Sequence, residues 1–275
     1  MEFKQAVGRY RSFQYFLPWR PVERSKVQVV LEAARLSSRA VNVAFGKAIV
    51  AYRDALSSAE RDALKAPLSA ALFDVAPVYI FWYFDMDARR KAIDEKKWPT
   101  VASGALVDVG AIGPPHGWSH RYVQEVVLPE VLMPGLEAGI QRGGNPDAGL
   151  AMAQGLLAAY DEGLAACLGP FAEEGGRRVL CAPETWEPVA AMFLGYPGES
   201  WSAAGQEPRK PFDEVFFDQC LERPFRRDPG VVEQLRGEGL IQDEKPPPWR
   251  SREVAALSRM LKEHLGDLGA PEAAT

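Results

Sequence analysis

Residues 146–170 read PDAGLAMAQGLLAAYDEGLAACLGP, and this stretch decides the fold. Drawn as a helix, residues 147–162 place apolar side chains around most of the circumference, which predicts a core helix buried on nearly all sides. Gly163 then supplies the left-handed stop that commonly ends a helix. Residues 164–168 form a short apolar run, typical of a strand, that leads into Gly169-Pro170. The stretch therefore predicts a buried helix that is followed directly by a core strand.

Further elements are predicted on both sides of this stretch. Residues 23–36 carry apolar side chains at helical spacing, and Ser25 is suited to cap the first turn of that helix. A second helix is predicted over residues 58–71. Strands are predicted over residues 47–52, 77–84 and 187–197, of which 77–84 is rich in aromatic and β-branched side chains.

The composition is that of a globular protein with a sizeable core, since 47% of the 275 residues are hydrophobic. The formal net charge of -5 argues against a general nucleic-acid binder, because such proteins need clustered lysine and arginine. The three cysteines lack CxxC spacing, so we expect reduced thiols and no structural metal. No signal peptide is visible, and the longest apolar run, residues 75–84, is shorter than the ~20 residues of a membrane-spanning helix. We therefore expect a cytoplasmic protein outside the membrane.

Glycine and proline interrupt the pattern over residues 85–145, between a core strand and the core helix. A segment of this length in such a place is typically a lid or an excursion that faces a partner. One of its turns carries His116 and Trp118, which are candidate pocket residues. The expected organisation is a main domain over residues 1–217 with an insertion at 85–145, and a C-terminal extension over 218–275 that contains an amphipathic helix at 251–265.

Four short segments carry groups suited to holding a phosphorylated ligand. They are Arg9-Tyr10-Arg11-Ser12-Phe13-Gln14, residues 34–42, Leu168-Gly169-Pro170-Phe171, and Gly195-Tyr196-Pro197 followed by Pro208-Arg209-Lys210-Pro211. Adjacent cations such as Arg209 and Lys210 fit a phosphate with a charge of about -2, and a guanidinium binds phosphate in a bidentate manner. A glycine such as Gly169 lets the main chain approach a ligand closely. Pro170, by contrast, has no N–H to donate.

In this order along the chain, the four segments resemble those of the FMN-dependent nitroreductase family. The first is similar to the family's Arg-Arg-Ser-x-Arg element, whose basic and hydroxyl groups hold the FMN phosphate and ribityl chain. Arg11 and Ser12 match this element, whereas Tyr10 and Gln14 stand in place of arginines. Arg9 is placed to compensate, one residue earlier in the chain.

The second segment resembles the family's Ala-Pro-Ser-x-x-Asn-x-Gln-Pro-Trp loop, which reaches the flavin held mainly by the other subunit. Asn42 matches, and Ser38 and Arg39 flank the hydroxyl position. Residues 44–46, Ala-Phe-Gly, replace Gln-Pro-Trp. The alternative is that Asn42 only caps a turn.

The third and fourth segments complete the resemblance. In the family, backbone N–H groups after the core strand approach N5 and O4 of the flavin, and Leu168, Gly169 and Pro170 occupy that point here. Since proline cannot donate, the resemblance implies Gly169 as the donor. The fourth segment is the closest match, and it implies that Arg209 and Lys210 bind the FMN phosphate.

The resemblance implies an α+β fold with a mainly antiparallel central sheet flanked by helices. It also implies an obligate homodimer with two FMN sites at the interface, in which residues 212–217 and the helix at 251–265 embrace the partner. The implied activity is ping-pong oxidoreduction: NADH or NADPH reduces FMN, which then reduces a nitro compound, a quinone or a dedicated metabolite. The flavin performs this chemistry, so no catalytic side chain is assigned. His116, Trp118 and Phe171 are the expected substrate-binding residues, with plain packing as the alternative for the aromatic ones.

The departures from the family pattern leave two other readings open. A neutral Gln14 in place of arginine predicts a comparatively low flavin reduction potential, unless Arg39 or Lys47 substitutes for it, because a cation near N1 stabilises the anionic reduced ring. The same departure, with the altered loop at 44–46, makes a non-catalytic flavin-binding or redox-sensing protein the main alternative. A scaffold that has lost flavin altogether is the third reading.

Rival sites have little support. His116 and His120 are separated by Gly-Trp-Ser and have no third metal ligand nearby. The chain contains no G-x-S-x-G nucleophile elbow, no G-x-G-x-x-G after a strand and no G-x-x-x-x-G-K-[ST] loop. A nicotinamide donor is therefore expected to stack directly over the flavin, in a place that Trp201 is also suited to line.

Overall fold

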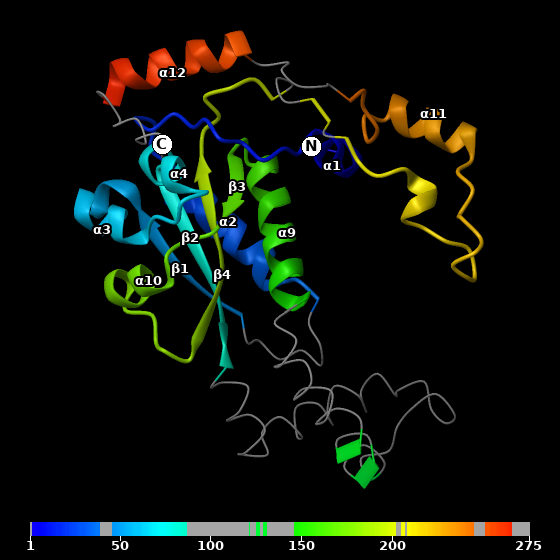
Figure 1. The fold of residues 1–275 in the computed structure, drawn as a ribbon, viewed down its shortest axis with the longest axis horizontal. Helices are drawn as coiled ribbons and strands as arrows, with labels where there is room; N and C mark the ends of the chain where they lie inside the picture. The colour runs from blue at the N-terminus through cyan, green and yellow to red at the C-terminus, as the bar shows by residue number, and fades with distance from the viewer. Residues whose placement is uncertain are drawn as a thin grey trace, which may run out of the picture.

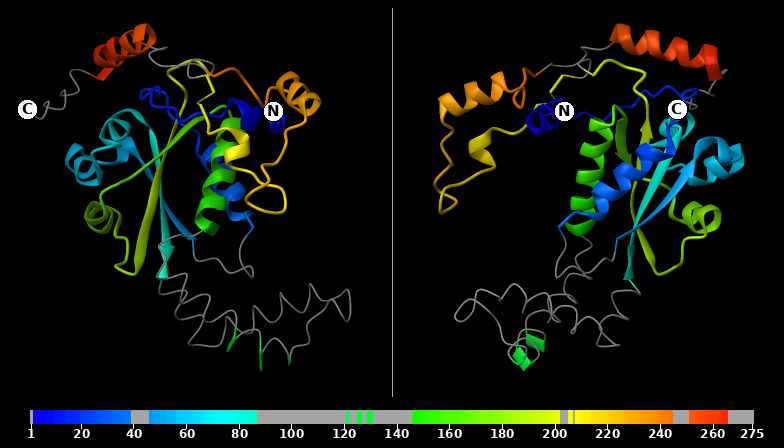
Figure 2. Two further views of the ribbon diagram at one scale, coloured as in Figure 1. Left: turned by 45° about the vertical axis from the view of Figure 1, so that its right-hand side comes forward. Right: turned by 180° about the vertical axis from the view of Figure 1, so that it is seen from behind.

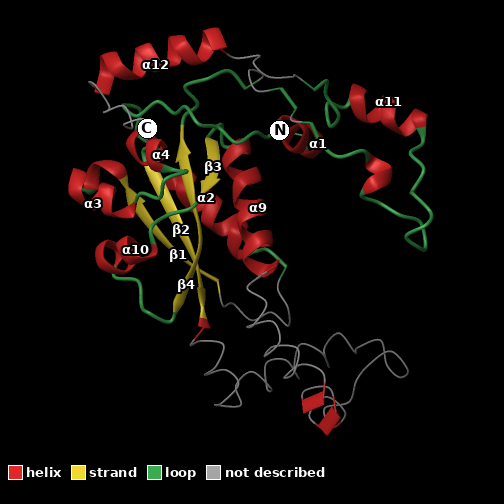
Figure 3. Cartoon of the chain, in the orientation of Figure 1, coloured by secondary structure: helices red, strands yellow, loops and turns green. Residues whose placement is uncertain are grey.

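The computed structural model describes residues 2–38, 46–86, 121, 125–126, 129–130, 146–201, 205–206, 208–244 and 251–265. Within these residues one antiparallel sheet has the strand order β1-β2-β4-β3. Its strands are β1 (Gly46–Tyr52), β2 (Val78–Asp85), β3 (Ala165–Gly169) and β4 (Trp186–Gly195). Helices lie on both faces of this sheet (Figures 1 and 3). The predicted α+β class with a mainly antiparallel sheet is confirmed.

The central strand β2 is buried along almost its whole length, because both faces of the sheet are covered. Its Ile80 is paired with Val50 of β1 on one side and with Met192 of β4 on the other. A strand buried on both faces needs a continuous apolar run rather than an alternating one, and β2 supplies that run. The central strand of the sheet is therefore the strand predicted over residues 77–84.

Two helices cover the first face of the sheet, α2 (Arg24–Arg35) and α9 (Pro146–Asp161). Their inner side chains join those of β2, β3 and β4 in one apolar cluster, which includes Val27, Val30, Ile80, Ala151, Leu156, Ala159, Leu164, Met192 and Leu194. Gly163 ends the α9 turn with a φ of 73°, as predicted. Helix α2 has Glu23 at its N-cap position and no side-chain cap. Ser25 lies inside the helix, so the predicted serine cap is wrong.

Helix α9 is not buried on nearly all sides, and the prediction is wrong on this point. Gly149, Ala153 and Gln154 are exposed, and Leu150 is 48% exposed. The reason is that α9 packs against α2 and the sheet only on its inner side. The residues on its outer side are apolar or small, but no described part of the chain covers them. Composition alone does not distinguish these two sides.

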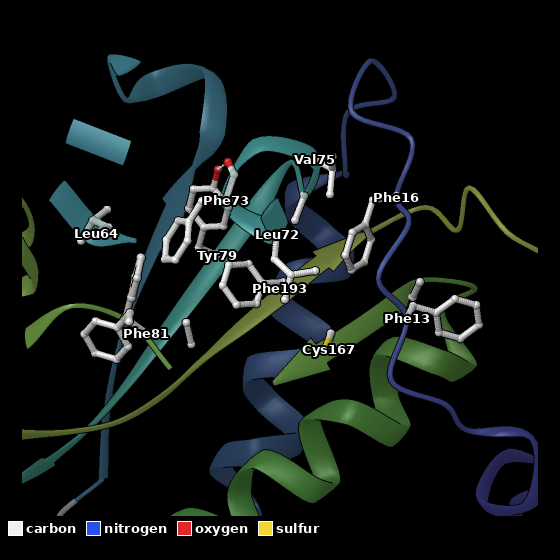
Figure 4. Close-up of a cluster of buried hydrophobic side chains, with 14 of the residues drawn as sticks. Phe13, Phe16, Leu64, Leu72, Phe73, Val75, Tyr79, Phe81, Cys167 and Phe193 are labelled. Carbon is white, nitrogen blue, oxygen red and sulfur yellow. Dashed lines mark hydrogen bonds between the residues drawn. The ribbon is translucent and has the colours of Figure 1, made fainter. Parts of the chain in front are cut away.

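The second face is covered by α3 (Ser58–Leu64), α4 (Ala70–Val75) and α10 (Glu173–Leu180). Aromatic rings dominate the core here, and Figure 4 shows Phe73, Tyr79 and Phe193 side by side. Phe73 meets Phe193 edge-on with a ring-centroid distance of 4.9 Å and lies 5.1 Å from Tyr79. Such tilted and edge-on pairs add to the stabilisation from burial alone.

The single helix predicted over residues 58–71 is two helices in the structure. Helix α3 ends at Leu64, and α4 begins at Ala70. Pro67 lies between them; its ring removes an N–H and disfavours the helical conformation of the preceding residue. A short 3-10 turn, η2 (Arg53–Ala55), precedes α3.

Helix α10 was not predicted, because it contains two adjacent poor helix formers, Gly175 and Gly176. Packing explains them. A Cβ on Gly175 would lie 1.8 Å from the carbonyl oxygen of Ala63, so no side chain fits where α10 meets α3. Here close helix contact outweighs intrinsic propensity.

The chain beyond β4 leaves the sheet. Residues 208–237, which we call the arm, contain the turn η5 (Phe212–Glu214) and α11 (Pro229–Gly237). Figure 2 shows the arm running away from the sheet, past the N-terminal helix α1 (Phe3–Arg9). The last helix, α12 (Ser251–Leu265), returns to the sheet end, where Leu261 joins the second-face cluster. Among the described residues, no helix is long and apolar enough to cross a membrane.

Candidate functional site

The N-terminal segment lies beside the edge strand β3. The N–H of Phe13 donates to the carbonyl of Ala166 at 3.2 Å, and Phe16 forms a bridge with Pro197. The segment with Arg11, Ser12 and Gln14 therefore runs next to the strand that ends at Gly169. Two of the four sequence segments, 150 residues apart, are neighbours in the fold.

A buried carboxylate fixes this segment. Glu199 Oε1 accepts the N–H groups of Gln14 at 3.1 Å and Tyr15 at 3.4 Å. Glu199 follows the Gly195-Tyr196-Pro197 motif closely in sequence, yet no local pattern indicates that its side chain is buried against the N-terminus. Sequence reasoning missed this residue. It links the first segment to the fourth.

The predicted phosphate ligands of the first segment have different surroundings. Arg11 is only 7% exposed, and its guanidinium donates to the carbonyls of Gly8 at 2.8 Å and Tyr10 at 2.6 Å. It also donates to Oε1 of Gln242 at 2.9 Å. Arg9, Ser12 and Gln14, by contrast, are exposed. Arg11 thus binds protein groups, and its neighbours remain open to a ligand.

Gln242 belongs to the arm root, by which we mean residues 205–206 and 238–244 at the two ends of the arm, where several contacts join the N- and C-terminal parts of the chain. Its N–H donates to Gln206 Oε1 at 3.0 Å, and Gln206 Nε2 donates to the carbonyl of Leu240 at 3.0 Å. A Cβ on Gly8 would lie 2.0 Å from the carbonyl oxygen of Gly239, so the two backbones touch. These contacts hold the arm against α1.

Lys4 and Glu238 form an ion pair at the same junction. The hydrogen bond from Lys4, with a second one from Gln234, keeps the pKa of the Glu238 carboxyl below its ordinary value. Both side chains are partly exposed, so water and salt weaken this pair. It orients α1 on the arm rather than contributing much stability.

A groove of about 760 Å³ lies along the arm root. Arg209 and Lys210 line it, and both are exposed. Arg227 also lines the groove and lies over the ring of Phe212 at 5.2 Å. Four lining residues are cationic and two are acidic, namely Arg209, Lys210, Arg227 and Arg236 against Asp243 and Glu244. The groove therefore carries an excess of positive charge, which suits an anion such as a phosphate.

The exit of β3 is tightly packed. A Cβ on Gly169 would lie 3.1 Å from Cβ of Ser69 and 3.2 Å from Cε2 of Phe193, so a side chain here would have to displace these neighbours. The carbonyl of Ala166 faces the N-terminal segment, away from β4. The backbone groups of successive residues in an antiparallel strand point to alternate sides. Those of Leu168 therefore face the same open edge, and those of Gly169 face β4. Sequence alone placed the ligand donor at Gly169.

Phe171 lies in the core. It is 8% exposed, and its ring meets Phe81 at 5.0 Å and Tyr83 at 5.4 Å. The ring of Phe171 therefore packs in the core, which is the alternative to a substrate-binding role for the aromatic residues. Trp201 likewise packs between Phe13 and Tyr160, at ring-centroid distances of 4.8 and 4.5 Å.

Several candidate residues fall outside the described part of the chain. These are Arg39, Asn42, His116 and Trp118, together with His120 and most of the insertion at 85–145. Ser38 is described and exposed. The structure therefore relates the first, third and fourth segments to one another.

Burial keeps two titratable side chains of the core neutral. Burial raises the pKa of the Cys167 thiol to about 11, so it is protonated at neutral pH and is a poor nucleophile. Burial likewise raises the pKa of Tyr83 to about 12. Cys167 and Tyr83 are core residues, whereas the groups suited to a ligand are cations and backbone amides.

No family model matches the amino-acid sequence, and no curated protein matches it. Solved structures do match. The nitroreductase family protein from Streptococcus pneumoniae TIGR4 has a TM-score of 0.53 and 20% identity, and the match covers 79% of this chain and 100% of that one. A proposed NAD(P)H:FMN oxidoreductase from Staphylococcus epidermidis has a TM-score of 0.56 and 17% identity, covering 78% and 94%. A proposed nitroreductase from Exiguobacterium sibiricum, solved in complex with FMN, has a TM-score of 0.52 and 18% identity, covering 78% and 96%.

These matches extend over most of this chain and nearly all of each solved chain, and they agree with one another. At such identities the likeness concerns the path of the backbone. The chain therefore has the nitroreductase fold.

Proposed function

We propose that the protein is an FMN-dependent oxidoreductase. The observation that carries the proposal is the positively charged groove at Arg209 and Lys210, tied through Gln242 and Arg11 to the segment beside the β3 exit. Three segments that resemble flavin-binding elements are thus brought together, in part through Gln242, in a fold shared with an FMN complex. A charged groove alone, or a shared fold alone, would be weaker support for this function, because one fold hosts many functions.

The residues present fit the cofactor. The phosphate of FMN needs cations and hydroxyl donors, which Arg209, Lys210, Arg9 and Ser12 offer from exposed positions. The backbone at the β3 exit, where the groups of Leu168 face the open edge, is suited to hydrogen-bond the edge of the ring. Ser38, Arg39 and Asn42 would reach the flavin of a second copy. When bound, FMN supplies the hydride chemistry, and the chain anchors its phosphate and orients its ring.

A nicotinamide donor and an organic acceptor would use the same flavin face in turn. The described residues contain no separate dinucleotide-binding unit, and the groove serves the cofactor. NADH or NADPH is the proposed donor, and a nitro compound, a quinone or a dedicated metabolite is the proposed acceptor. The insertion at 85–145, with His116 and Trp118, is where we place selectivity for the acceptor.

The proposed holoprotein has a low flavin reduction potential. Gln14 is neutral, and its N–H group is bound by the buried carboxylate of Glu199. Without a cation at this position, the anionic reduced ring lacks the stabilisation that the arginine of the family pattern would supply. A midpoint potential well above that of free FMN would contradict this.

We also propose a homodimer, in which the arm lies on the partner. Large apolar side chains on the arm are open to solvent in the single chain: Val215, Phe216, Phe217, Leu221, Phe225 and Val231. The outer side of α9, with Leu150, offers a second uncovered apolar surface. Exposed apolar groups concentrated in this way mark an interaction site.

The testing experiment has two steps. The purified protein is first examined for bound FMN, and is then mixed with NADH or NADPH without oxygen. Flavin that bleaches within seconds supports the oxidoreductase. Bound flavin that stays oxidised with both donors would favour the non-catalytic flavin-binding protein. A colourless protein that takes up no added FMN would contradict both.

A further inference from the structure

Ser69 makes an unexpected long-range hydrogen bond. It occupies the N-cap position of α4, where a serine side chain normally accepts an N–H group from the first helical turn. Here the side chain makes no such cap. Its hydroxyl instead donates to the carbonyl of Pro170 at 2.5 Å, with a longer contact of 3.3 Å to the carbonyl of Ala66. Ser69 is 1% exposed, so water does not compete for this bond.

Ser57 provides the contrast within the same chain. It occupies the N-cap position of α3, and its hydroxyl oxygen accepts the N–H of Glu60 at 3.3 Å. Glu60 in turn accepts the N–H of Ser57 at 2.8 Å, which completes a capping box. The same residue type at the same helical position thus serves its own helix in α3 and a distant backbone in α4.

The backbone that Ser69 holds is restrained on both sides. Before Pro170, Gly169 packs against Ser69 and Phe193 so closely that a Cβ would be 3.1 and 3.2 Å from them. After it, the N–H of Ala172 donates to the carbonyl of Leu64 at 2.9 Å. Pro170 itself has no N–H, so its carbonyl is the one backbone group through which this residue can be anchored by a hydrogen bond.

Anchoring the Pro170 carbonyl also orients the N–H of Phe171. The two groups belong to one planar peptide unit and point in opposite directions when that unit is trans. With the carbonyl directed at Ser69, the Phe171 N–H points away from α4. Among the described residues no hydrogen bond from this N–H is present, although backbone donors in buried segments are nearly always paired.

We propose that Ser69 is a positioning residue that aims the Phe171 N–H at the flavin ring. This inference rests on the proposed function and moves the ring-side donor from Gly169, whose backbone faces β4, to Phe171. Ser69 does not touch the cofactor. It acts through the Pro170–Phe171 peptide, whose orientation is free to change when the hydroxyl is lost.

The test compares Ser69→Ala with Ser57→Ala, which removes the same hydroxyl from the other N-cap. FMN affinity is measured by fluorescence titration of the full-length protein, and the potential by redox titration. Ser69→Ala should raise the FMN dissociation constant about fivefold, the value of one net hydrogen bond. It should also shift the flavin midpoint potential and change the visible circular dichroism of the flavin. Ser57→Ala should lower the melting temperature and leave all three flavin properties unchanged.

Ser69→Cys retains a weaker donor of similar size and should give intermediate values, which serves as a second variant if Ser69→Ala is unstable. Flavin properties of Ser69→Ala equal to those of the wild type would overturn the inference and leave the proposed function intact. Equal changes in Ser57→Ala and Ser69→Ala would also overturn it, since they would reflect loss of stability. Failure of the wild type to bind FMN would show in the first titration, and would overturn the proposed function together with the inference.

Discussion

The guanidinium of Arg11 donates to Oε1 of Gln242 at 2.9 Å and thereby joins residues 231 positions apart in the chain. Arg11 is also bonded to the carbonyls of Gly8 and Tyr10, so its charge is held at the root of the arm. The resemblance suggested a direct phosphate ligand at this position. In the structure its guanidinium contacts protein groups, and through Gln242 it helps to place the arm that carries Arg209 and Lys210.

Removing the partner of Arg11 should loosen the arm. In Gln242→Ala the buried guanidinium loses an acceptor, which should lower the free energy of unfolding by about 1–3 kcal/mol. Proteolysis of the arm at residues 208–237 should become faster. Glu233→Ala, which removes an exposed side chain from the same part of the chain, is the control and should change neither property. Equal stability and cleavage rates in both variants would show that Arg11 does not restrain the arm.

Removing cations from the groove should weaken binding of the phosphate specifically. Arg209→Ala and Lys210→Ala should each raise the FMN dissociation constant about tenfold, because each loses a charge-assisted hydrogen bond. Riboflavin, which lacks the phosphate, should bind these variants and the wild type equally. Arg24→Ala, an exposed cation on α2, is the control. If riboflavin binding weakened as much as FMN binding, the two cations would not be phosphate ligands.

Restoring a cation in the N-terminal segment should raise the flavin potential. Gln14→Arg places a positive charge where the resemblance expects one, and should raise the midpoint potential by about 30 mV, the two-electron equivalent of ~1.4 kcal/mol. Gln28→Arg adds the same charge on an exposed part of α2 and should have no effect. If Gln14→Arg left the midpoint potential unchanged, residue 14 would not lie close to the flavin.

A charge on the arm should disrupt the proposed dimer. Leu221 is 71% exposed in the single chain, and Leu221→Glu would place a carboxylate in the proposed apolar contact. Light scattering should then show a shift from dimer to monomer. Leu68 is 90% exposed but lies outside the arm, so Leu68→Glu should leave the dimer intact. A wild-type monomer that binds FMN would contradict the dimer itself.

Acid should remove the contribution of the Lys4–Glu238 pair. The hydrogen bond from Lys4 lowers the pKa of Glu238 below 4.5 in the folded chain, so the folded state binds fewer protons than the unfolded state in this range. The stabilisation is therefore present above pH 4.5 and is lost as the pH falls through the lowered pKa. Glu238→Gln should melt below the wild type at pH 7 and together with it in acid. Glu233→Gln, on the same helix, should melt with the wild type at both pH values.

Local patterns predicted most elements of the sheet. The apolar run at 77–84 and the stretch at 146–170 each became the expected strand or helix within one or two residues. The two misses have different causes. Pro67 divides the helix at 58–71, which is a local effect, whereas the two glycines of α10 are explained by packing: a Cβ on Gly175 would collide with Ala63 of α3, and one on Gly176 with the Tyr83 hydroxyl. Helix propensity is a property of one residue type by itself, whereas packing depends on the residues that surround it in the fold.

The amino-acid sequence by itself determined the α+β class, the core strand β2, the turn at Gly163 and the presence of paired cations at Arg209 and Lys210. Only the tertiary structure decided which polar groups meet. It directed Arg11 to Gln242, Glu199 to the N–H groups of Gln14 and Tyr15, and Ser69 to Pro170. Hydrophobic periodicity is a property of residues that lie close together in the sequence. A hydrogen bond between residues 100 or more positions apart depends on backbone placement within a few tenths of an ångström, which only the packed fold supplies.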